Sequence, residues 1–328
     1  MRLRVFLTLG VALLLGAFAW AVLVPTATAR QATLVVEVPA HAGVLDIARR
    51  LRESDVIRSE TAFVALTLAR GSMRRLKAGE YEIPRDASAW HVLGLLESGR
   101  VRQHAVLHPE GATVAELARA LEAERLAPGA EVLRVAADRK FLDTLGVEGP
   151  SVEGYLFPDT YMFVRGLTVE EMLGRMVQRT RAKLPPDVVE RAAARGLSLH
   201  QLLTLASIIE REAVEPSERR VISGVFWNRL RMDMPLQADP TVQYAAAKER
   251  RALTRADLLT DHPYNTYRRP GLPPGPISSP GLAAIEAAVD PAPVRYLYFV
   301  AVDERRHHFS TTVEEHNAAV ARYRLTRK

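Results

Sequence analysis

The segment Leu199–Ala213 most constrains the fold of this chain, because it reads as a helix with apolar residues on nearly every side. Ser198 stands where an N-cap residue belongs. A helix that is apolar all round is buried in a core. With 328 residues and 48% hydrophobic content, the chain is long enough to build such a core in each of two domains.

The same segment ends in acids. Glu210 and Glu212 fall in its last turn, where the helix macrodipole disfavours negative charge. Residues two apart on a helix point roughly 200° apart, so a continuous helix cannot aim both at one substrate atom. Burial and the dipole raise a carboxyl pKa and favour a proton donor near neutral pH. Either glutamate fits that role, and ion pairing with Arg211 or Arg219 is the structural alternative.

An uncharged run of 20 residues, 5–24, follows a short basic N-terminus, 1–4. It is long enough to span a bilayer. Because arginines precede the run and no charge follows until Arg30, the positive-inside rule keeps the N-terminus cytoplasmic and places the rest of the chain outside. Ala27-Thr28-Ala29 also fits a signal-peptidase site. We favour a transmembrane anchor, since the run exceeds the roughly 7–15 residues of a signal-peptide core.

Residues 33–150 are expected to form small strand–helix modules. A strand over 33–38, a turn and a helix over 44–52 recur at an offset of 70 residues, with Pro39/Pro109 and Leu51/Leu121 in register. Two copies are too few for a solenoid, so the pattern predicts an internal duplication of one strand–turn–helix unit. A Gly-Pro pair at 149–150 marks the junction with a second domain, 151–328.

The second domain is predicted to be mainly helical with a few short strands. Ser217 is expected to cap a helix over 218–231, and Asp239, followed by Pro240, to cap another that reaches about residue 248. The segment 262–280 holds six prolines and two glycines, so it is predicted to be a long ordered loop of the kind that carries function. Its Tyr264, Asn265 and Tyr267 offer the aromatic faces and the amide that carbohydrate recognition uses.

A second aromatic segment, Glu153–Tyr161, is predicted either to stack on sugars or to line the core as a turn.

The motifs of several other classes of functional site are absent from the sequence. The sequence contains no cysteine, no glycine-rich phosphate loop, no zinc-binding His pair and no nucleophile elbow. The net charge of +6 is scattered, which argues against nucleic acid and suits an anionic polymer or a membrane. One perturbed glutamate beside aromatic loops suggests acid catalysis on a glycan.

Seven motifs in one order resemble the YceG-like endolytic murein transglycosylases of bacterial cell walls. They are Glu153–Tyr161, Ala206–Glu212, Val225–Leu230, Leu236–Val242, Tyr264–Tyr267, Gly271–Ile277 and Tyr296–Val300. The resemblance extends over about residues 33–325. It implies an α+β protein with one span of the inner membrane, LysM-like modules ahead of a catalytic domain, and neither a cofactor nor a metal. The implied partners are peptidoglycan glycan strands and peptidoglycan synthases, with no nucleic acid.

The resemblance also assigns roles. Glu212 becomes the catalytic acid because it directly precedes a small residue, Ala213, where family members often carry Thr or Ser; Glu210 is the fallback. The acid protonates the glycosidic oxygen between N-acetylmuramic acid and N-acetylglucosamine, and the muramic acid's own C6 hydroxyl closes a 1,6-anhydro ring. The candidate substrate-binding residues are Asn228, Gln237, Asp239, Tyr264, Asn265 and Glu153.

Two alternatives stay open. A muramidase would cut the same bond with water, using Glu153 or Asp239 as the second carboxylate that hydrolysis normally needs. A wall-binding scaffold would grip glycan with the duplicated modules and keep Glu212 as a structural residue. The products distinguish the enzymes, because hydrolysis leaves reducing ends and transglycosylation leaves anhydro ends.

Overall fold

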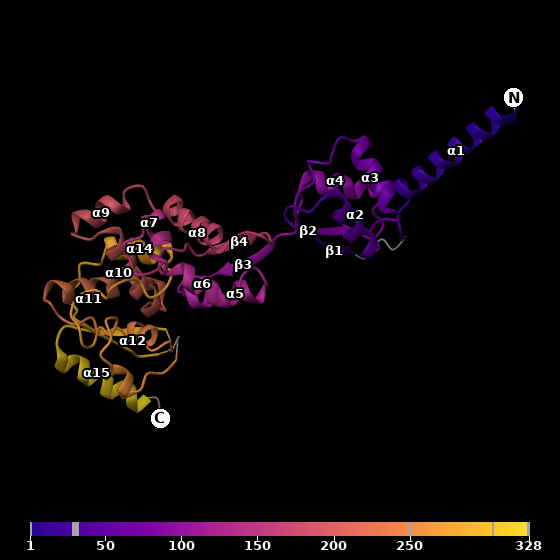
Figure 1. Cartoon of the computed structure of the whole chain (residues 1–328). Helices are drawn as coiled ribbons and strands as arrows, with labels where there is room; N and C mark the ends of the chain where they lie inside the picture. The colour runs from indigo at the N-terminus through magenta and orange to yellow at the C-terminus, as the bar shows by residue number, and fades with distance from the viewer. Residues whose placement is uncertain (1, 28–32, 249–250, 304, 327–328) are drawn as a thin grey trace. The chain divides into compact units, whose positions relative to one another are not determined.

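The computed structural model describes residues 2–27, 33–248, 251–303 and 305–326. These residues form two compact units, Met1–Ala105 with Met162–Leu167, and Val106–Tyr161 with Thr168–Lys328 (Figure 1). The expected mixture of many helices and few short strands is confirmed. Each sheet of the described part has only two strands: β1–β2, β3–β4 and β5–β6.

The first helix, α1 (Arg2–Leu23), contains the apolar run. Within the described residues, it alone is long and apolar enough to cross a membrane. It is consistent with a single-pass anchor. Residues 28–32, which include Arg30 and most of the candidate signal-peptidase site Ala27-Thr28-Ala29, lie outside the described residues.

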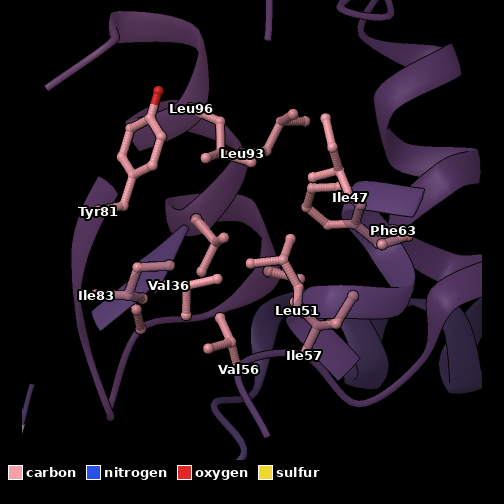
Figure 2. Packing of buried hydrophobic residues seen from close by; sticks show 14 of the residues in the cluster. Val36, Ile47, Leu51, Val56, Ile57, Phe63, Tyr81, Ile83, Leu93 and Leu96 are labelled. Atoms are coloured by element: carbon pink, nitrogen blue, oxygen red, sulfur yellow. The ribbon is translucent and has the colours of Figure 1, made fainter. Parts of the chain in front are cut away.

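Unit 1 is built around an antiparallel pair, β1 (Thr33–Val38) and β2 (Gly79–Pro84). Its helices are α2 (Val44–Glu53), α3 (Glu60–Ala69) and α4 (Ala89–Ser98). Figure 2 shows the core between them, where Val36 and Ile83 from the strands meet Leu51, Phe63 and Leu93 from the helices. Every second strand residue faces this core, as expected of a half-buried strand.

The predicted duplication is visible in the backbone. The pair β1 and α2 is repeated, 70 residues later, by β3 (His104–His108) and α5 (Val114–Ala123). The turns match as well: His41 and Gly111 both have positive φ, and so do Asp55 and Arg125. The two copies fall mainly in different units, because the units divide at Ala105/Val106. A LysM-like role for either copy stays a prediction.

Unit 2 is mostly helical. Beyond α5 it contains α6 (Gly129–Ala136), α7 (Arg139–Thr144), α8 (Val169–Lys183), α9 (Val188–Ala194), α10 (Leu199–Glu212), α11 (Arg219–Arg231), α12 (Asp239–Ala245), α13 (Arg255–Leu259), α14 (Leu282–Val289) and α15 (Val313–Thr326). The strand β4 (Asp159–Phe163) pairs with β3, and β5 (Tyr298–Ala301) pairs antiparallel with β6 (His307–Ser310). The buried α10 packs against α9, α11, α12 and α14.

Two helices, α10 and α11, were predicted to begin with a serine N-cap. Ser198 caps α10 as expected, with a capping box completed by Gln201. Ser217 is not a cap, which corrects the prediction. Pro216 begins a short 3₁₀ turn, Pro216–Glu218, and α11 starts only at Arg219. Proline is favoured in the first turn of a helix because it has no backbone N–H that needs a partner. Pro216 takes that position one residue before Ser217, so Ser217 lies inside the 3₁₀ turn and not at its start.

Candidate active site

The central helix α10 ends in a carboxyl-rich last turn. Residues 202–209 are buried all round, so the helix is fixed by packing along most of its length. This rigid rod presents Glu210 and Glu212 on different sides, as their spacing requires. Their surroundings differ, and the difference separates a structural acid from a candidate catalyst.

Glu210 makes structural contacts with residues outside α10. Its Oε2 accepts the backbone N–H of Gly281 at 3.1 Å, and its Oε1 lies 3.5 Å from Nη2 of Arg219. Gly281 is the N-cap of α14, so the carboxylate satisfies an N–H that the helix itself cannot. Burial raises the pKa of Glu210, and the Gly281 N–H opposes that rise. This acid joins α10 to α14.

Glu212 is half-buried at the last residue of α10. Burial, followed by the nearby charge of Asp239, raises its pKa to about 8. The charges of Arg211 and Arg229, followed by the backbone N–H of Asp239, oppose the rise. A carboxyl with this pKa carries its proton at neutral pH and can give it away, as a general acid must.

Asp239 lies beside Glu212 but is not the helix cap that the sequence predicted. The N-cap of α12 is Ala238, and no side chain caps the helix. The exposed Asp239 carboxylate instead accepts the hydroxyl of Tyr267 at 2.5 Å. Burial, with the Asp239 bond next, raises the pKa of Tyr267, so the phenol keeps its proton and stays a donor. Glu212, Asp239 and Tyr267 therefore form one group.

Arg229 fixes the chain that leads into Asp239. Its side chain is 5% exposed and its Nη1 donates to the carbonyls of Pro235 and Leu236 at 3.1 and 2.8 Å, and to Oε1 of Gln237 at 3.2 Å. Nε donates to Leu297 at 2.6 Å. No role for Arg229 was predicted from the sequence. A charged group among apolar neighbours was the available signal, because buried charges are nearly always paired.

The long loop 262–280 is ordered by contacts with α10 and the start of α12. Thr266 accepts the N–H groups of Gln237 and Ala238 at 3.0 Å each, through its carbonyl and its hydroxyl. Further along, Ile277 donates its N–H to the hydroxyl of Ser207 at 3.0 Å. These bonds hold the loop so that Tyr267 reaches Asp239.

The side-chain amides of Asn228 and Asn265, both predicted to bind substrate, donate to backbone carbonyls instead. Nδ2 of Asn228 donates to the carbonyls of Val294 and Tyr296 at 3.0 and 2.9 Å. Asn265 is 1% exposed, and its Nδ2 donates to Leu258 and Thr260 at 3.0 and 2.8 Å. Gln237, in contrast, is exposed at a positive φ of 51°. Of these three, only Gln237 has an exposed side chain next to Asp239.

Glu153 belongs to a separate cluster. It is 3% exposed and accepts the N–H of Val114 at 3.1 Å. Burial raises its pKa to about 8, and the hydroxyl of Tyr244 in α12 opposes that rise. Burial, followed by the charge of Glu153, raises the pKa of Tyr264 to about 12. The Glu153–Tyr155 turn is buried, as in the core-lining alternative. Among the described residues, the bonds of Glu153 run to α5, its own turn and α12, and not to Glu212.

Among the described residues, no cluster of three or more His, Cys, Asp or Glu side chains could hold a metal ion. The chemistry that the arrangement offers is proton transfer by one carboxyl, backed by Asp239, Tyr267 and Arg229.

The fold and the site are those of a mainly helical unit that carries one proton-bearing glutamate at the end of a buried helix. The chain belongs to the YceG-like family, whose model matches residues 36–322. It is 35% identical to the endolytic murein transglycosylase of Bacillus subtilis (strain 168), over 94% of this chain and 90% of that protein.

Two further comparisons support the assignment to this family. The endolytic murein transglycosylase of Streptococcus pneumoniae serotype 2 (strain D39) is 30% identical over 88% of this chain, which spans 58% of that protein's length. The crystal structure of a putative YceG-like protein from Listeria monocytogenes superposes with a TM-score of 0.61 at 33% identity. The match includes 88% of this chain and 99% of the other.

Proposed function

We propose that this protein is a membrane-anchored lytic transglycosylase that cuts peptidoglycan glycan strands internally, with Glu212 as its single general acid and base. The relatives named endolytic murein transglycosylase support the reaction class. The contrast between the two acids of α10 supports the residue: Glu210 is bonded to Gly281 and Arg219, whereas Glu212 lies beside Asp239 and has a pKa raised to about 8, mainly by burial.

The proposed reaction balances with one carboxyl. Protonated Glu212 gives its proton to the glycosidic oxygen as the bond from C1 of N-acetylmuramic acid breaks. The C6 hydroxyl of the same sugar bonds to C1, and its proton passes to the Glu212 carboxylate. The products are a 1,6-anhydro end and a free hydroxyl on the leaving N-acetylglucosamine. No water is consumed, so no second carboxylate is required.

The neighbours of Glu212 fit supporting roles. The backbone N–H of Asp239 lowers the pKa of Glu212 and so favours the carboxylate that is left after proton transfer. The Asp239 carboxylate adds negative charge where an oxocarbenium-like transition state becomes positive. Tyr267 fixes that carboxylate, and Arg229 fixes the backbone before it.

The test is mass spectrometry of products from purified glycan strands and the full chain in detergent. We expect anhydro-muramyl ends from the wild type and a loss of about 10²–10⁴-fold in rate for Glu212→Gln, the usual contribution of general acid–base catalysis. Glu215→Gln, which removes a neighbouring acid paired with Arg305 at 3.5 Å, is the matched control and should retain activity. If Glu210→Gln, well folded by its melting curve, were the only inactive variant, the assignment would be wrong.

The proximity of Asp239 to Glu212 favours one second candidate, a muramidase. In that enzyme Asp239 would activate water and the products would carry reducing ends. The same mass spectra decide between the two. Unchanged binding of glycan without any cleavage would instead support the scaffold.

The anchor completes the proposal. We infer that α1 spans the inner membrane with the N-terminus in the cytoplasm, because its flanking arginines precede the apolar run. A phosphatase active only outside the cytoplasm, fused after residue 328, should be active. A fusion partner active only in the cytoplasm should not be, and the reverse pattern would contradict this orientation.

A further inference from the structure

The last turns of α1 are packed into unit 1 rather than connected by a free linker. Val22 is 3% exposed and belongs to the core cluster of unit 1, and Phe18 packs against the same cluster. Arg58 donates to the carbonyls of Val24 and Pro25 at 3.3 and 2.5 Å and lies 4.3 Å from the ring centroid of Trp20. If α1 spans a membrane, the surface of that membrane therefore lies against unit 1.

The helix next to this contact is α3, beside α1 in Figure 1. Its inner face buries Phe63, Leu66 and Thr67. Its outer face is exposed at Thr61, Ala65, Leu68 and Ala69, and the helix carries no charge after Glu60. Leu68 is 55% exposed. Helices at a water-exposed surface normally turn a charged face outward, so an apolar outer face is unusual.

Contacts at the two ends of α3 reach α1 and its neighbour α4. At its start, Arg58 contacts the end of α1. At its end, the guanidinium of Arg70 lies 4.4 Å from the ring centroid of Trp90 in the first turn of α4. That turn also reaches α1, because Ser88 and His91 line one hollow with Leu23 and Pro25. The helix α3 therefore packs beside both α1 and α4.

The rim of this face has the residues of a membrane interface. Trp20 and Trp90 are about half exposed, and tryptophan collects at the headgroup level of bilayers. Four arginines, Arg58, Arg70, Arg74 and Arg75, flank the helix in the sequence. Glu97 pairs with Arg70 at 3.0 Å and with Arg75 at 3.2 Å, so the group keeps a positive surplus that suits anionic lipid.

We propose that α3 lies in the outer interface of the same bilayer that α1 spans, with Leu68 and Ala65 at the boundary of headgroups and acyl chains and Trp90 with Arg70 among the headgroups. The partner is a lipid surface that contains anionic phospholipid. This inference rests on the proposed membrane anchoring. Unit 1 is then attached to the membrane through two elements, which fixes its orientation as a single span cannot.

The chain contains no cysteine, so one introduced cysteine can carry a spin label. In the full chain, one copy per nanodisc, Leu68→Cys reports on α3. Leu45→Cys, an equally apolar site 66% exposed on α2 of the same unit, is the matched control. Leu14→Cys, 72% exposed on α1, reports on the anchor. All three side chains are exposed, so labelling should leave the fold intact.

We expect oxygen to collide with the labels at Leu14 and Leu68 severalfold more often than with the label at Leu45, and a water-soluble nickel complex severalfold less often. In discs of neutral lipid the Leu68 label should become more accessible to nickel than in discs with anionic lipid. A water-exposed Leu68 label beside a lipid-exposed Leu14 label would overturn the inference and leave the anchor intact. A water-exposed Leu14 label would contradict the anchor itself.

Discussion

At the scale of single residues, contacts with distant segments distinguish the two acids of α10. Glu210 accepts the N–H of Gly281, 71 residues away, whereas Glu212 lies near the charge of Asp239. The sequence predicted that the two acids point apart, because helix geometry dictates it. It left the choice between them to a resemblance, since the partners come from α14 and α12 and no local pattern encodes them.

Replacing Glu212 should stabilise the fold in a pH-dependent way. Its native pKa of about 8 lies above the ordinary 4.5, so between these values the native state binds more protons than the unfolded state, and stability falls as pH rises. Glu212→Gln keeps the neutral form at every pH. We expect equal melting temperatures at pH 4, and at pH 9 a variant more stable by on the order of 1–2 kcal/mol.

Calorimetry of both proteins across this pH range measures the difference, with Glu215→Gln as the control for the loss of one charge. A gap that did not change between pH 4 and pH 9 would show that the Glu212 pKa is ordinary.

Tyr267 should matter for catalysis through Asp239. Tyr267→Phe removes the 2.5 Å donor to that carboxylate and leaves the ring in place. We expect a fall of about tenfold in the cleavage rate, equivalent to about 1.4 kcal/mol, with little change in melting temperature. Tyr155→Phe, which removes a 3.0 Å bond to His200, is the matched control and should cleave at the wild-type rate. Equal activity of the two variants would leave Tyr267 without a role.

At the scale of elements, the site depends on how the loop 262–280 is held. Its existence was predictable from its prolines, which exclude a helix. Its anchors were not, because Ser207 and Thr266 are small hydroxyl residues that look like ordinary core and turn residues. The prediction of Asp239 as the N-cap of α12 was wrong for a related reason. The Tyr267 hydroxyl donates to the Asp239 carboxylate, so a tertiary contact replaced the expected local one.

Gly154 shows how closely the loop approaches the turn Glu153–Tyr155. A Cβ at Gly154 would lie 2.2 Å from Cβ of Pro276, in a proline ring that has little freedom to move away. Gly196 has nearly the same φ, 79° against 78°, and nothing within 4 Å. Gly196→Ala therefore measures the left-handed strain alone, about 1–2 kcal/mol. Gly154→Ala should cost about 3 kcal/mol or more in denaturant unfolding, and equal costs would mean that the approach is looser.

At the scale of the whole molecule, the duplication was readable because it repeats both apolar positions and turns. The two copies belong to different units, because the second copy, after Ala105, folds with the helical part of the chain. Sequence similarity between two segments reports their common local structure, whereas the unit to which each belongs depends on the core that it helps to build.

Separate cores predict two unfolding transitions in calorimetry of the full chain in detergent. Leu96 is fully buried in the core cluster of unit 1, and Leu205 is fully buried on α10 in unit 2. Replacing either by alanine should cost about 2–5 kcal/mol, because it leaves a cavity. We expect Leu96→Ala to lower one transition and Leu205→Ala the other, since each cavity weakens only the core that contains it. A single transition that both variants lowered together would show that the two units unfold as one cooperative body.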